Sequence, residues 1–502
     1  MQAYALETPH GAFRGSRDRF ETVVSWLGGE EAAGLTHAEL EARLQVDGRE
    51  LLRQLLQDHL DLRAQREPQA AGVVGADGVT RQRPEAGRER GLATVFGEVR
   101  VRRTAYRARG HADLHPADAL LNLPAEQHSH GLRRLAAVES TRGSFAEAAG
   151  AVEQATGQRL GNRQVEQLAQ RAAVDFDRFY AARPRHLALA GDVLVLSCDG
   201  KGIVMRPEAL RAATRAAGKT TRKLATRLSK GEKRNRKRMA EVGAVYHCAP
   251  VARTPDDILP VADTSHPPGK TGPTARGKWL VASVTGDAAG VITQVFDEAT
   301  RRDPDHHRTW VALADGNIHQ LDRIHTEART RGVDVTIVVD FVHVLEYVWK
   351  AAWCFFAEGD PDAETWVRIH AHAILGGRAS TVAAAIRRKA TCNHLSPAQR
   401  ANADTCATYL LNKRPYLDYP TALAQGWPIA TGVIEGACRH LVKDRMDLTG
   451  ARWGLAGAEA ILKLRALVAN GDFDAYWAYH LDQERQRVHQ TRYADGLIPA
   501  IR

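Results

Sequence analysis

Three apolar runs in the middle of the chain each end in an aspartate, and this repetition limits the folds that the chain can adopt. The runs are residues 192–198, 309–314 and 333–339, and the aspartates that follow them are Asp199, Asp315 and Asp340. Uninterrupted apolar runs of this length are typical of strands that are buried on both faces of a sheet. We therefore expect an α/β fold in which carboxylates follow the ends of buried strands.

Further elements between these runs complete an ordered pattern. The sequence predicts two more strands at 241–248 and 278–284, an extension of the first strand at 201–205, and helices at 290–302, 318–331 and 341–356. Three strands followed by helix, strand, helix, strand and helix is the order of the ribonuclease H-like fold. Its mixed sheet has the first and fourth strands as neighbours. Asp199 and Asp315 are then expected to meet at one end of the sheet.

A third carboxylate comes from the segment 426–453, where an apolar run leads into a predicted helix that begins near Glu435. Two strand-end carboxylates and one helical carboxylate can hold two divalent ions about 3.5–4 Å apart for phosphoryl transfer. Oxygen ligands suit Mg²⁺ or Mn²⁺ rather than zinc. Taken singly, Glu435 is also explained by the helix dipole, and each aspartate by a turn or a helix N-cap. Their order within this fold favours a metal site.

The sign of the net charge indicates the class of partner. The 502 residues carry a formal net charge of +10, which favours a polyanion such as nucleic acid. No apolar run reaches the length of a membrane span, and the N-terminus lacks a signal-peptide pattern, so we expect a cytoplasmic protein without membrane contact. The six cysteines are scattered, so neither a disulfide framework nor a zinc ribbon is expected.

Composition and periodicity divide the N-terminal part into three regions. Residues 1–67 are expected to be helical, with a capping box from Thr36 to Glu39. Residues 68–116 are expected as a linker up to about residue 90, then a basic strand pair bent at Gly97. Residues 117–190 are again expected to be helical. Their helices near 144–156 and 162–174, with Gln164 and Gln167 exposed, fit a DNA-binding helix-turn-helix, although any two packed helices give the same pattern.

The remaining regions surround the predicted site. They are a ribonuclease H-like core at 191–357 with a basic insertion at 207–240, a helical insertion at 358–425, a catalytic helix region at 426–470 and a C-terminal tail at 471–502. The basic insertion is expected to be disordered, a DNA-backbone arm or a solvated helical face. The cations expected to bind DNA are Lys230, Lys233, Arg234, Arg236, Lys237, Arg238, Arg439, Lys443, Arg445 and Arg452.

Several of these segments resemble the DDE transposases of bacterial insertion sequences, specifically the ISKra family, which is akin to the Mutator-like transposases. The segments are SCDGKGIVM, VALADGNIHQL, VVDFVHVLEYVW, GVIEGACRHLVKDRMDLTGARWG, TVFGEVRVRRTAY and SFAEAA. The resemblance spans nearly the whole chain from about residue 90. Where many relatives carry a C-x-x-C pair, this chain has the cysteine-free segment 107–110, so the resemblance leaves open whether zinc binds in this region.

The resemblance implies a set of roles. Asp199, Asp315 and Glu435 would be the catalytic, metal-holding residues, with Mg²⁺ or Mn²⁺ as cofactor. Asp340 with His343 resembles a supporting D/C-x-x-H motif. The partners would be double-stranded DNA at the transposon ends and at the target, bound by a homodimer or higher homo-oligomer. The activity would be cleavage at terminal inverted repeats followed by strand transfer from the freed 3′-hydroxyl.

Two alternatives remain open from the sequence. The first is a ribonuclease H-like nuclease or resolvase that cuts DNA without strand transfer, and the second is a transposase-derived DNA-binding protein without catalysis. Strand order also predicts that Asp315, and not Asp340, is the second metal ligand, because the fifth strand lies about 4.8 Å further from the first.

Overall fold

The computed structural model describes residues 9–183, 191–260, 271–448 and 450–499. It divides into two compact units. Unit 1 comprises Met1–Ala182 and Gly471–Arg502, and unit 2 comprises Arg183–Asn470. The C-terminal residues expected as a tail therefore belong to the body of unit 1. The parts of the N-terminal and helical regions expected at 1–8 and 184–190 lie outside the described residues.

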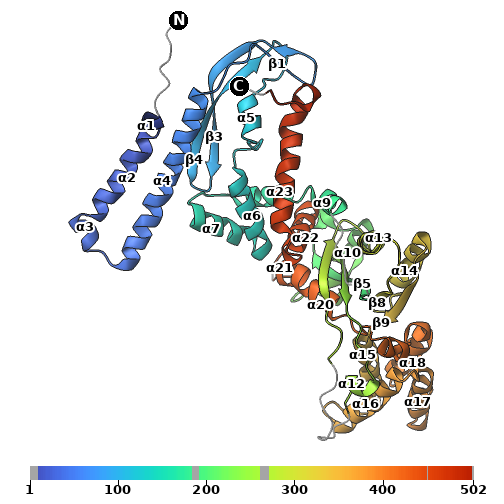
Figure 1. Cartoon of the computed structure of the whole chain (residues 1–502). Coiled ribbons are helices and arrows are strands. Elements are labelled where there is room, and N and C mark those ends of the chain that lie inside the picture. Colours follow the sequence, from blue (N-terminus) through green and yellow to red (C-terminus); the bar gives the residue numbers. More distant parts are fainter. Residues whose placement is uncertain (1–8, 184–190, 261–270, 449, 500–502) are drawn as a thin grey trace. The chain divides into compact units, whose positions relative to one another are not determined.

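The core of unit 2 is a mixed five-stranded sheet in the order β7-β6-β5-β8-β9 (Figure 1). Its strands are β5 (Val193–Val204), β6 (Lys237–Cys248), β7 (Arg276–Ser283), β8 (Trp310–Ala314) and β9 (Val335–Val339). β5, β6 and β7 are antiparallel neighbours, and β8 and β9 run parallel to β5. The predicted adjacency of the first and fourth strands is confirmed, and the chain is an α/β protein.

β5 is longer than the apolar run that predicts it. Its partner β6 pairs with it residue for residue from Val193 opposite Cys248 to Val204 opposite Lys237. Asp199 therefore lies within a strand instead of ending one. The ladder continues through Gly200 and Gly202 because β6 supplies hydrogen-bond partners that the sequence of β5 does not reveal. The basic insertion correspondingly ends earlier than expected, at the start of β6.

Three helices connect and flank the parallel strands. They are α13 (Ala288–Arg302), α14 (Ile318–Arg331) and α15 (Phe341–Ala352). α13 and α14 agree closely with the predicted helices, whereas α15 ends before the predicted residue 356. Between β5 and β6 the basic insertion forms a short 3-10 turn, η1 (Pro207–Ala209), and two helices, α10 (Ala212–Thr220) and α11 (Lys230–Arg234). This segment is partly helical and not wholly irregular.

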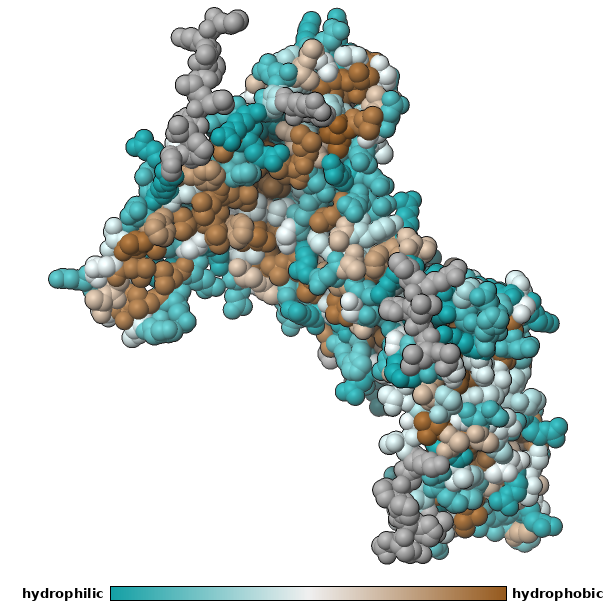
Figure 2. Space-filling model, viewed as in Figure 1, coloured by the Kyte–Doolittle hydropathy of each residue, from teal (hydrophilic) through white to brown (hydrophobic). Residues whose placement is uncertain are grey.

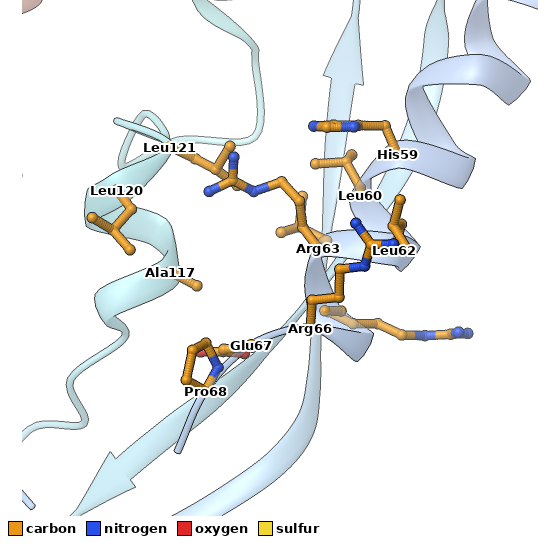
Figure 3. A pocket seen from close by; sticks show the side chains of 13 residues that line it. His59, Leu60, Leu62, Arg63, Arg66, Glu67, Pro68, Ala117, Leu120 and Leu121 are labelled. Carbon is orange, nitrogen blue, oxygen red and sulfur yellow. The ribbon is translucent and has the colours of Figure 1, made fainter. Parts of the chain in front are cut away.

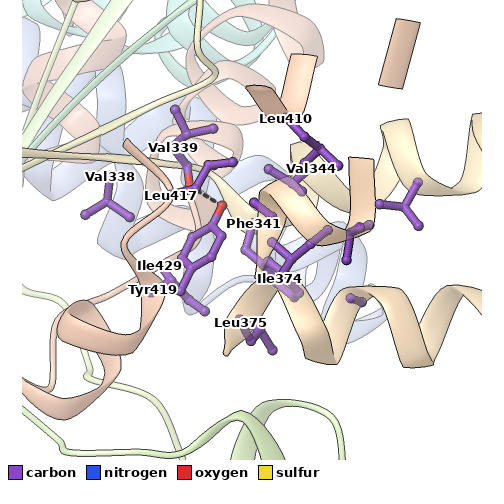
Figure 4. Close-up of a cluster of buried hydrophobic side chains, with 14 of the residues drawn as sticks. Val338, Val339, Phe341, Val344, Ile374, Leu375, Leu410, Leu417, Tyr419 and Ile429 are labelled. Carbon is purple, nitrogen blue, oxygen red and sulfur yellow. Dashed lines mark hydrogen bonds between the residues drawn. The ribbon is translucent and has the colours of Figure 1, made fainter. Parts of the chain in front are cut away.

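The helical insertion shares its hydrophobic core with the sheet. Its helices are α16 (Pro361–Leu375), α17 (Ala379–Cys392), α18 (Ala401–Lys413) and α19 (Tyr419–Ala424). Buried side chains of β9 and α15, including Val339, Phe341 and Val344, pack in one cluster with Ile374 and Leu410 of the insertion (Figure 4). The insertion thus stabilises the edge of the sheet that carries Asp340.

After the insertion the chain forms α20 (Gly432–Ala437), the π-helical turn η3 (Cys438–Lys443), α21 (Asp444–Met446) and α22 (Leu455–Ala469). α20 contacts β5 and β6, and η3 contacts β5. This packing returns the segment containing Glu435 to the strand that carries Asp199.

Unit 1 begins with a helical hairpin (Figure 1). α1 (Pro9–Ala12) and α2 (Arg14–Leu27) lead through the short α3 (Glu30–Ala33) into the long α4 (His37–Gln65). The predicted capping box is present, because Thr36 accepts from the Glu39 backbone N–H and the Glu39 carboxylate accepts from the Thr36 N–H at 2.8 Å. The end of α4 packs on a two-stranded hairpin through Leu60, Val99 and Val101.

That strand pair is longer than expected. β1 (Val73–Val74) and β2 (Thr80–Arg81) precede β3 (Arg83–Thr94) and β4 (Gly97–Arg107). The predicted linker from 68 to 90 is wrong in its second half, because residues 83–90 pair with β4. Gly97 has a φ of 138° where the chain reverses between the two strands, which explains the bend expected there.

The rest of unit 1 is helical: α5 (Pro116–Leu120), α6 (His130–Arg142), α7 (Phe145–Thr156), α8 (Asn162–Ala172), α9 (Phe176–Ala182) and α23 (Phe473–Glu484). Gln164 and Gln167 of α8 are exposed as predicted. The buried Asp175 holds α23 and the π-helical turn that follows it, η4 (Arg485–His489). Asp175 accepts from His480 at 2.7 Å and from Arg487 at 2.9 Å.

In the described part of the chain, no helix combines the length and the apolar composition that a membrane span requires.

The shared core of unit 2 predicts the stability of Tyr419 variants. The Tyr419 side chain is fully buried, and its hydroxyl donates to the Val339 carbonyl at 2.8 Å (Figure 4). Tyr419→Ala should lower the free energy of unfolding by roughly 3–5 kcal/mol, as other large aromatic truncations do. Tyr419→Phe should lower it by about 1 kcal/mol, because the buried carbonyl loses its donor.

Denaturant titration followed by tryptophan fluorescence measures both effects, since seven of the nine tryptophans lie between residues 279 and 453 in unit 2. Tyr416→Phe is the matched control, because the Tyr416 hydroxyl contacts only the exposed His325 ring in the described structure, at 3.0 Å. Equal stability of the Tyr419→Phe and Tyr416→Phe proteins would contradict the burial of the Tyr419 hydroxyl in the shared core.

Candidate active site

The pairing of β5 with β8 brings two aspartates to one edge of the sheet. Ser197 of β5 lies opposite Leu313 of β8 in a parallel register. Asp199 and Asp315 each follow that pair by two residues, so they lie on corresponding positions of neighbouring strands. Both line one pocket of about 380 Å³, together with Glu241, Asn317 and other residues. The predicted convergence of Asp199 with Asp315 is therefore observed.

Backbone hydrogen bonds orient both carboxylates. Asp199 Oδ1 accepts from the Gly200 N–H at 2.7 Å, and Asp315 Oδ1 accepts from the Asn317 N–H at 2.8 Å. The Asp315 backbone carbonyl also accepts from the Tyr409 hydroxyl at 3.1 Å. Each carboxylate is thus oriented by a backbone N–H one or two residues later in the chain, and α18 holds the backbone of Asp315.

Asp340 is placed differently from Asp199 and Asp315. It is 3% exposed and caps α15, with Oδ1 accepting from the Val342 N–H at 3.0 Å. Its Oδ2 accepts from the Thr431 hydroxyl at 2.6 Å. Asp340 is not among the residues that line the pocket. The arrangement agrees with the expectation that Asp315, and not Asp340, faces the same space as Asp199.

Glu435 lies on α20, next to this Asp340–Thr431 pair. Its Oε1 is 3.2 Å from the Thr431 hydroxyl, whose single proton goes to the closer Asp340. One turn later, the Cys438 thiol donates to Asp199 Oδ2 at 3.4 Å. The helix that carries Glu435 is thus tied to both acidic strand segments, while Glu435 itself is exposed.

The three carboxylates do not converge on one point. Within residues 9–183, 191–260, 271–448 and 450–499, no three His, Cys, Asp or Glu side chains are grouped closely enough to hold one metal ion. Asp199 and Asp315 share the pocket, and Glu435 lies beside it, near Thr431. The structure therefore brings two of the predicted ligands together and positions the third on a neighbouring helix.

Glu241 is an acidic residue of the pocket that the sequence analysis missed. It lies on β6 opposite Gly200 and lines the same space as Asp199. A Cβ atom at Gly200 would lie 2.9 Å from Glu241 Oε2, so the glycine leaves room for this side chain. The only signal in the sequence is a single acid in the otherwise apolar run 240–248, directly opposite the residue after Asp199 once the register is known.

The electrostatics of the pocket fit a hard divalent cation. Burial, and next the negative charge of Asp199, raise the pKa of Glu241 above its usual value. A cation between these oxygens would offset the repulsion, and Mg²⁺ or Mn²⁺ prefers carboxylate ligands. Burial, together with the charge of Asp199, also raises the pKa of Cys438 well above the usual thiol value.

Of the cations expected to bind DNA in the basic insertion, only some are accessible. Lys230, Lys233 and Arg234 are exposed on α11, and Arg236 is half-buried. Lys237 lies 3.6 Å from Asp447. Arg238 donates to the Val284 carbonyl at 2.7 Å, and burial lowers the pKa of its guanidinium. The Arg238 guanidinium is therefore engaged by backbone carbonyls, and its contact with DNA stays a prediction.

Near Glu435, one of the cations expected to bind DNA is buried. Arg439, Lys443 and Arg452 are exposed, with Arg439 3.8 Å from Asp444. Arg445 is 3% exposed, and its guanidinium lies over the Trp453 ring at 4.7 Å. The prediction that Arg445 lies on the same face as Arg439 assumed 3.6 residues per turn. η3 is a π-helical turn with more residues per turn, so the side chains that follow it face other directions. Arg445 consequently points into the core.

His343 is a partly exposed residue of α15 that contacts aromatic rings. Its ring lies edge-on to those of Tyr347 and Tyr409, which stack on each other with centroids 4.0 Å apart. His343 does not line the pocket of Asp199 and Asp315. His343 contacts Tyr409, whose hydroxyl donates to the Asp315 backbone carbonyl, and its supporting role stays a prediction.

A different pocket, of about 250 Å³, lies in unit 1 between the end of α4, β4 and α5 (Figure 3). Leucines and the stems of Arg63 and Arg66 form much of its lining. Its one acid, Glu67, accepts from the Thr104 N–H at 2.8 Å. This lining offers no pair of carboxylates comparable with that in unit 2.

The chain matches no protein-family model and no curated protein in sequence.

The raised pKa of Glu241 predicts a pH-dependent stability change. Its folded pKa lies above the unfolded value, so ionised Glu241 destabilises the fold above the folded pKa. This penalty vanishes below the unfolded value of about 4.5. Glu241→Gln should therefore raise the melting temperature at pH 7 in metal-free buffer and change it little at pH 4. Mg²⁺ or Mn²⁺ should shrink the difference at pH 7.

Differential scanning calorimetry at the two pH values measures this effect. The exposed Glu208→Gln is the matched control and should leave the melting temperature unchanged at both pH values. A Glu241→Gln protein less stable than wild type at pH 7 without metal would show that Glu241 is not held against Asp199.

Proposed function

We propose that this chain is a DDE transposase that acts on DNA by metal-dependent phosphoryl transfer in a ribonuclease H-like domain. The observation that carries the proposal is the shared pocket of Asp199 and Asp315, two carboxylates on adjacent parallel strands of a mixed sheet in the order β7-β6-β5-β8-β9. The sequence resemblance to insertion-sequence transposases supports it, since its segments contain Asp199, Asp315 and Glu435.

Each residue of the proposed site has its own role. Asp199 and Asp315 would hold Mg²⁺ or Mn²⁺ in the pocket, and Glu435 would approach from α20. Bound divalent ions supply activation of the attacking hydroxyl and stabilisation of the leaving oxygen. Asn317 and Gly200 hold the two aspartates in place through their N–H groups. Thr431 donates its hydroxyl proton to buried Asp340 and lies 3.2 Å from Glu435 Oε1, so Glu435 keeps the freedom to turn toward the ions.

Double-stranded DNA at the ends of a mobile element and at its target is the proposed substrate. Exposed cations on α11 and near η3 suit the phosphate backbone. α7 and α8, with exposed Gln164 and Gln167, suit recognition of a terminal repeat. The corresponding location is the bacterial nucleoid, and the assembly on DNA is a homodimer or a higher homo-oligomer.

A nuclease or resolvase would use the same carboxylates without joining strands. Incubating the protein with a cut terminal-repeat duplex and a supercoiled target separates the two activities. Joined products support a transposase. Cleavage without joining supports the nuclease, and DNA binding without either reaction supports a non-catalytic DNA-binding protein.

Glu435→Gln should separate DNA binding from cleavage. Gln keeps the shape of Glu but removes the charge that a hard divalent ion requires. Cleavage of a terminal-repeat duplex in Mg²⁺ should fall by about a thousandfold or more, because lost charge stabilisation in phosphoryl transfer amounts to several kcal/mol. Binding should persist, since α20 and the exposed cations remain.

Single-turnover cleavage and a gel-shift titration on the same duplex measure the two properties. Glu346→Gln, at an exposed glutamate of α15, is the matched control and should cut normally. A Glu435→Gln protein that cuts at nearly the wild-type rate, or that folds but no longer binds DNA, would remove Glu435 from the catalytic set.

The exposed cations of α11 predict a change in salt dependence. Replacing Lys230, Lys233 and Arg234 by Gln should weaken DNA binding for all sequences alike. If all three contact phosphates, the slope of log K against log salt should fall by about 2.7, or about 0.9 for each lost contact. Fluorescence anisotropy between 50 and 300 mM salt measures the slope. The charge-conserving variant Lys230→Arg, Lys233→Arg, Arg234→Lys should retain the wild-type slope. An unchanged slope in the Gln variant would show that α11 does not contact the DNA phosphate backbone.

A further inference from the structure

The helical hairpin of unit 1 exposes an apolar stripe along both of its long helices. On α2 the exposed residues are Phe20, Val24 and Leu27, at helical spacings of four and three. On α4 they include Leu44, Leu52 and Leu55, with exposed fractions between 38% and 46%. Figure 2 shows apolar surface running along the hairpin formed by these helices. A stripe of this extent requires a partner, because a helix that is stable in water normally covers its apolar face.

The hairpin itself provides little cover for this stripe. The buried residues of α2 and α4 are Ser16, Asp58 and Leu60. All three lie at the base, where Ser16 donates to Asp58 Oδ2 through its hydroxyl at 2.6 Å and through its N–H at 2.9 Å. The base is anchored on β4, whereas the part toward α3 is a two-helix projection. Two helices cannot enclose a core, but four helices can.

The charges of the hairpin are distributed unevenly along its length. The tip, residues 27–42, contains Glu30, Glu31, Glu39 and Glu41 and no Lys or Arg, so its net charge is −4. The base comprises residues 14–20 and 58–66, with five arginines and three aspartates, so its net charge is +2. Two hairpins packed antiparallel would place the acidic tip of each against the basic base of the other. A two-fold axis makes both contacts at once.

We propose that the α2–α4 hairpin is the interface for a second copy of this chain and forms an antiparallel four-helix bundle with it. DNA is a poor occupant, because residues 14–65 contain seven basic and ten acidic residues in a chain of net charge +10. The stripe on α4 between Leu44 and Leu55 extends about 17 Å at 1.5 Å per residue. It is continuous with α2, as expected for a bundle seam. The proposal needs neither DNA nor a metal, so its failure would leave the catalytic proposal intact.

The first test is the mass of the full chain in solution without DNA. Sedimentation equilibrium of the wild type should give a dimer at micromolar concentration. The variant Val24→Glu, Leu52→Glu should be monomeric with an unchanged circular dichroism spectrum, because both side chains are exposed. Val46→Glu is the matched control. Val46 is 60% exposed on α4 but lies about 200° around the helix from Leu44, so this variant should remain dimeric.

The second test distinguishes an antiparallel pair of identical chains from any other partner. The tip variant Glu31→Lys, Glu41→Lys and the base variant Arg14→Glu, Arg63→Glu should each weaken self-association by about tenfold or more, because like charges then oppose each other. An equimolar mixture should recover wild-type dimerisation, since each charge-reversed end meets its complement. A monomeric wild type, an unaffected stripe variant or a mixture that associates no better than its components would overturn the proposal.

Discussion

The parallel pairing of β5 with β8 is the constraint on which the candidate active site depends. Leu194, Val195 and Leu196 lie opposite Trp310, Val311 and Ala312, and these six side chains are buried. Hydrophobic packing on both faces therefore fixes the register. A slip by one residue would exchange the faces of all side chains on one strand. Asp199 and Asp315 share a pocket because this register places them at equal distances beyond Ser197 and Leu313.

The elements that the sequence predicted well are those whose signal is local. The apolar runs ending at Asp315 and Asp340 correspond to β8 and β9, and the periodic segments correspond to α13 and α14. Asp199 differs because β5 continues past it through two glycines. The long antiparallel ladder with β6 decides that continuation, and its partner residues lie about forty positions away. The apolar residues after the glycines predicted an extension at 201–205, but the residues of β5 alone do not show that both parts form one continuous strand.

The sequence predictions that differ from the structure do so for one physical reason, namely contacts between residues that lie far apart in the chain. Arg238 and Arg445 look like surface cations in the sequence, but one donates to the Val284 carbonyl and the other lies over the Trp453 ring. The segment 471–502 looks like a tail because the buried partners of α23, such as Asp175, lie about three hundred residues earlier. Glu241 was missed for the same reason, since its relation to Asp199 exists only across two strands.

The carboxylates near the pocket differ in how firmly they are held, and this difference has a mechanical consequence. Asp199 and Asp315 each accept a backbone N–H bond, and Asp340 is buried between an N–H and a hydroxyl. Glu435 is exposed, and its contact with Thr431 is a long 3.2 Å in which the proton serves Asp340. Moving Glu435 therefore breaks no strong hydrogen bond, whereas moving any of the aspartates breaks at least one. Asp199 and Asp315 line the pocket and are fixed on the sheet, whereas Glu435 lies on α20, outside the pocket lining. In the proposed function, Glu435 would therefore reach bound ions by rotation of its side chain, and the strands would stay in place.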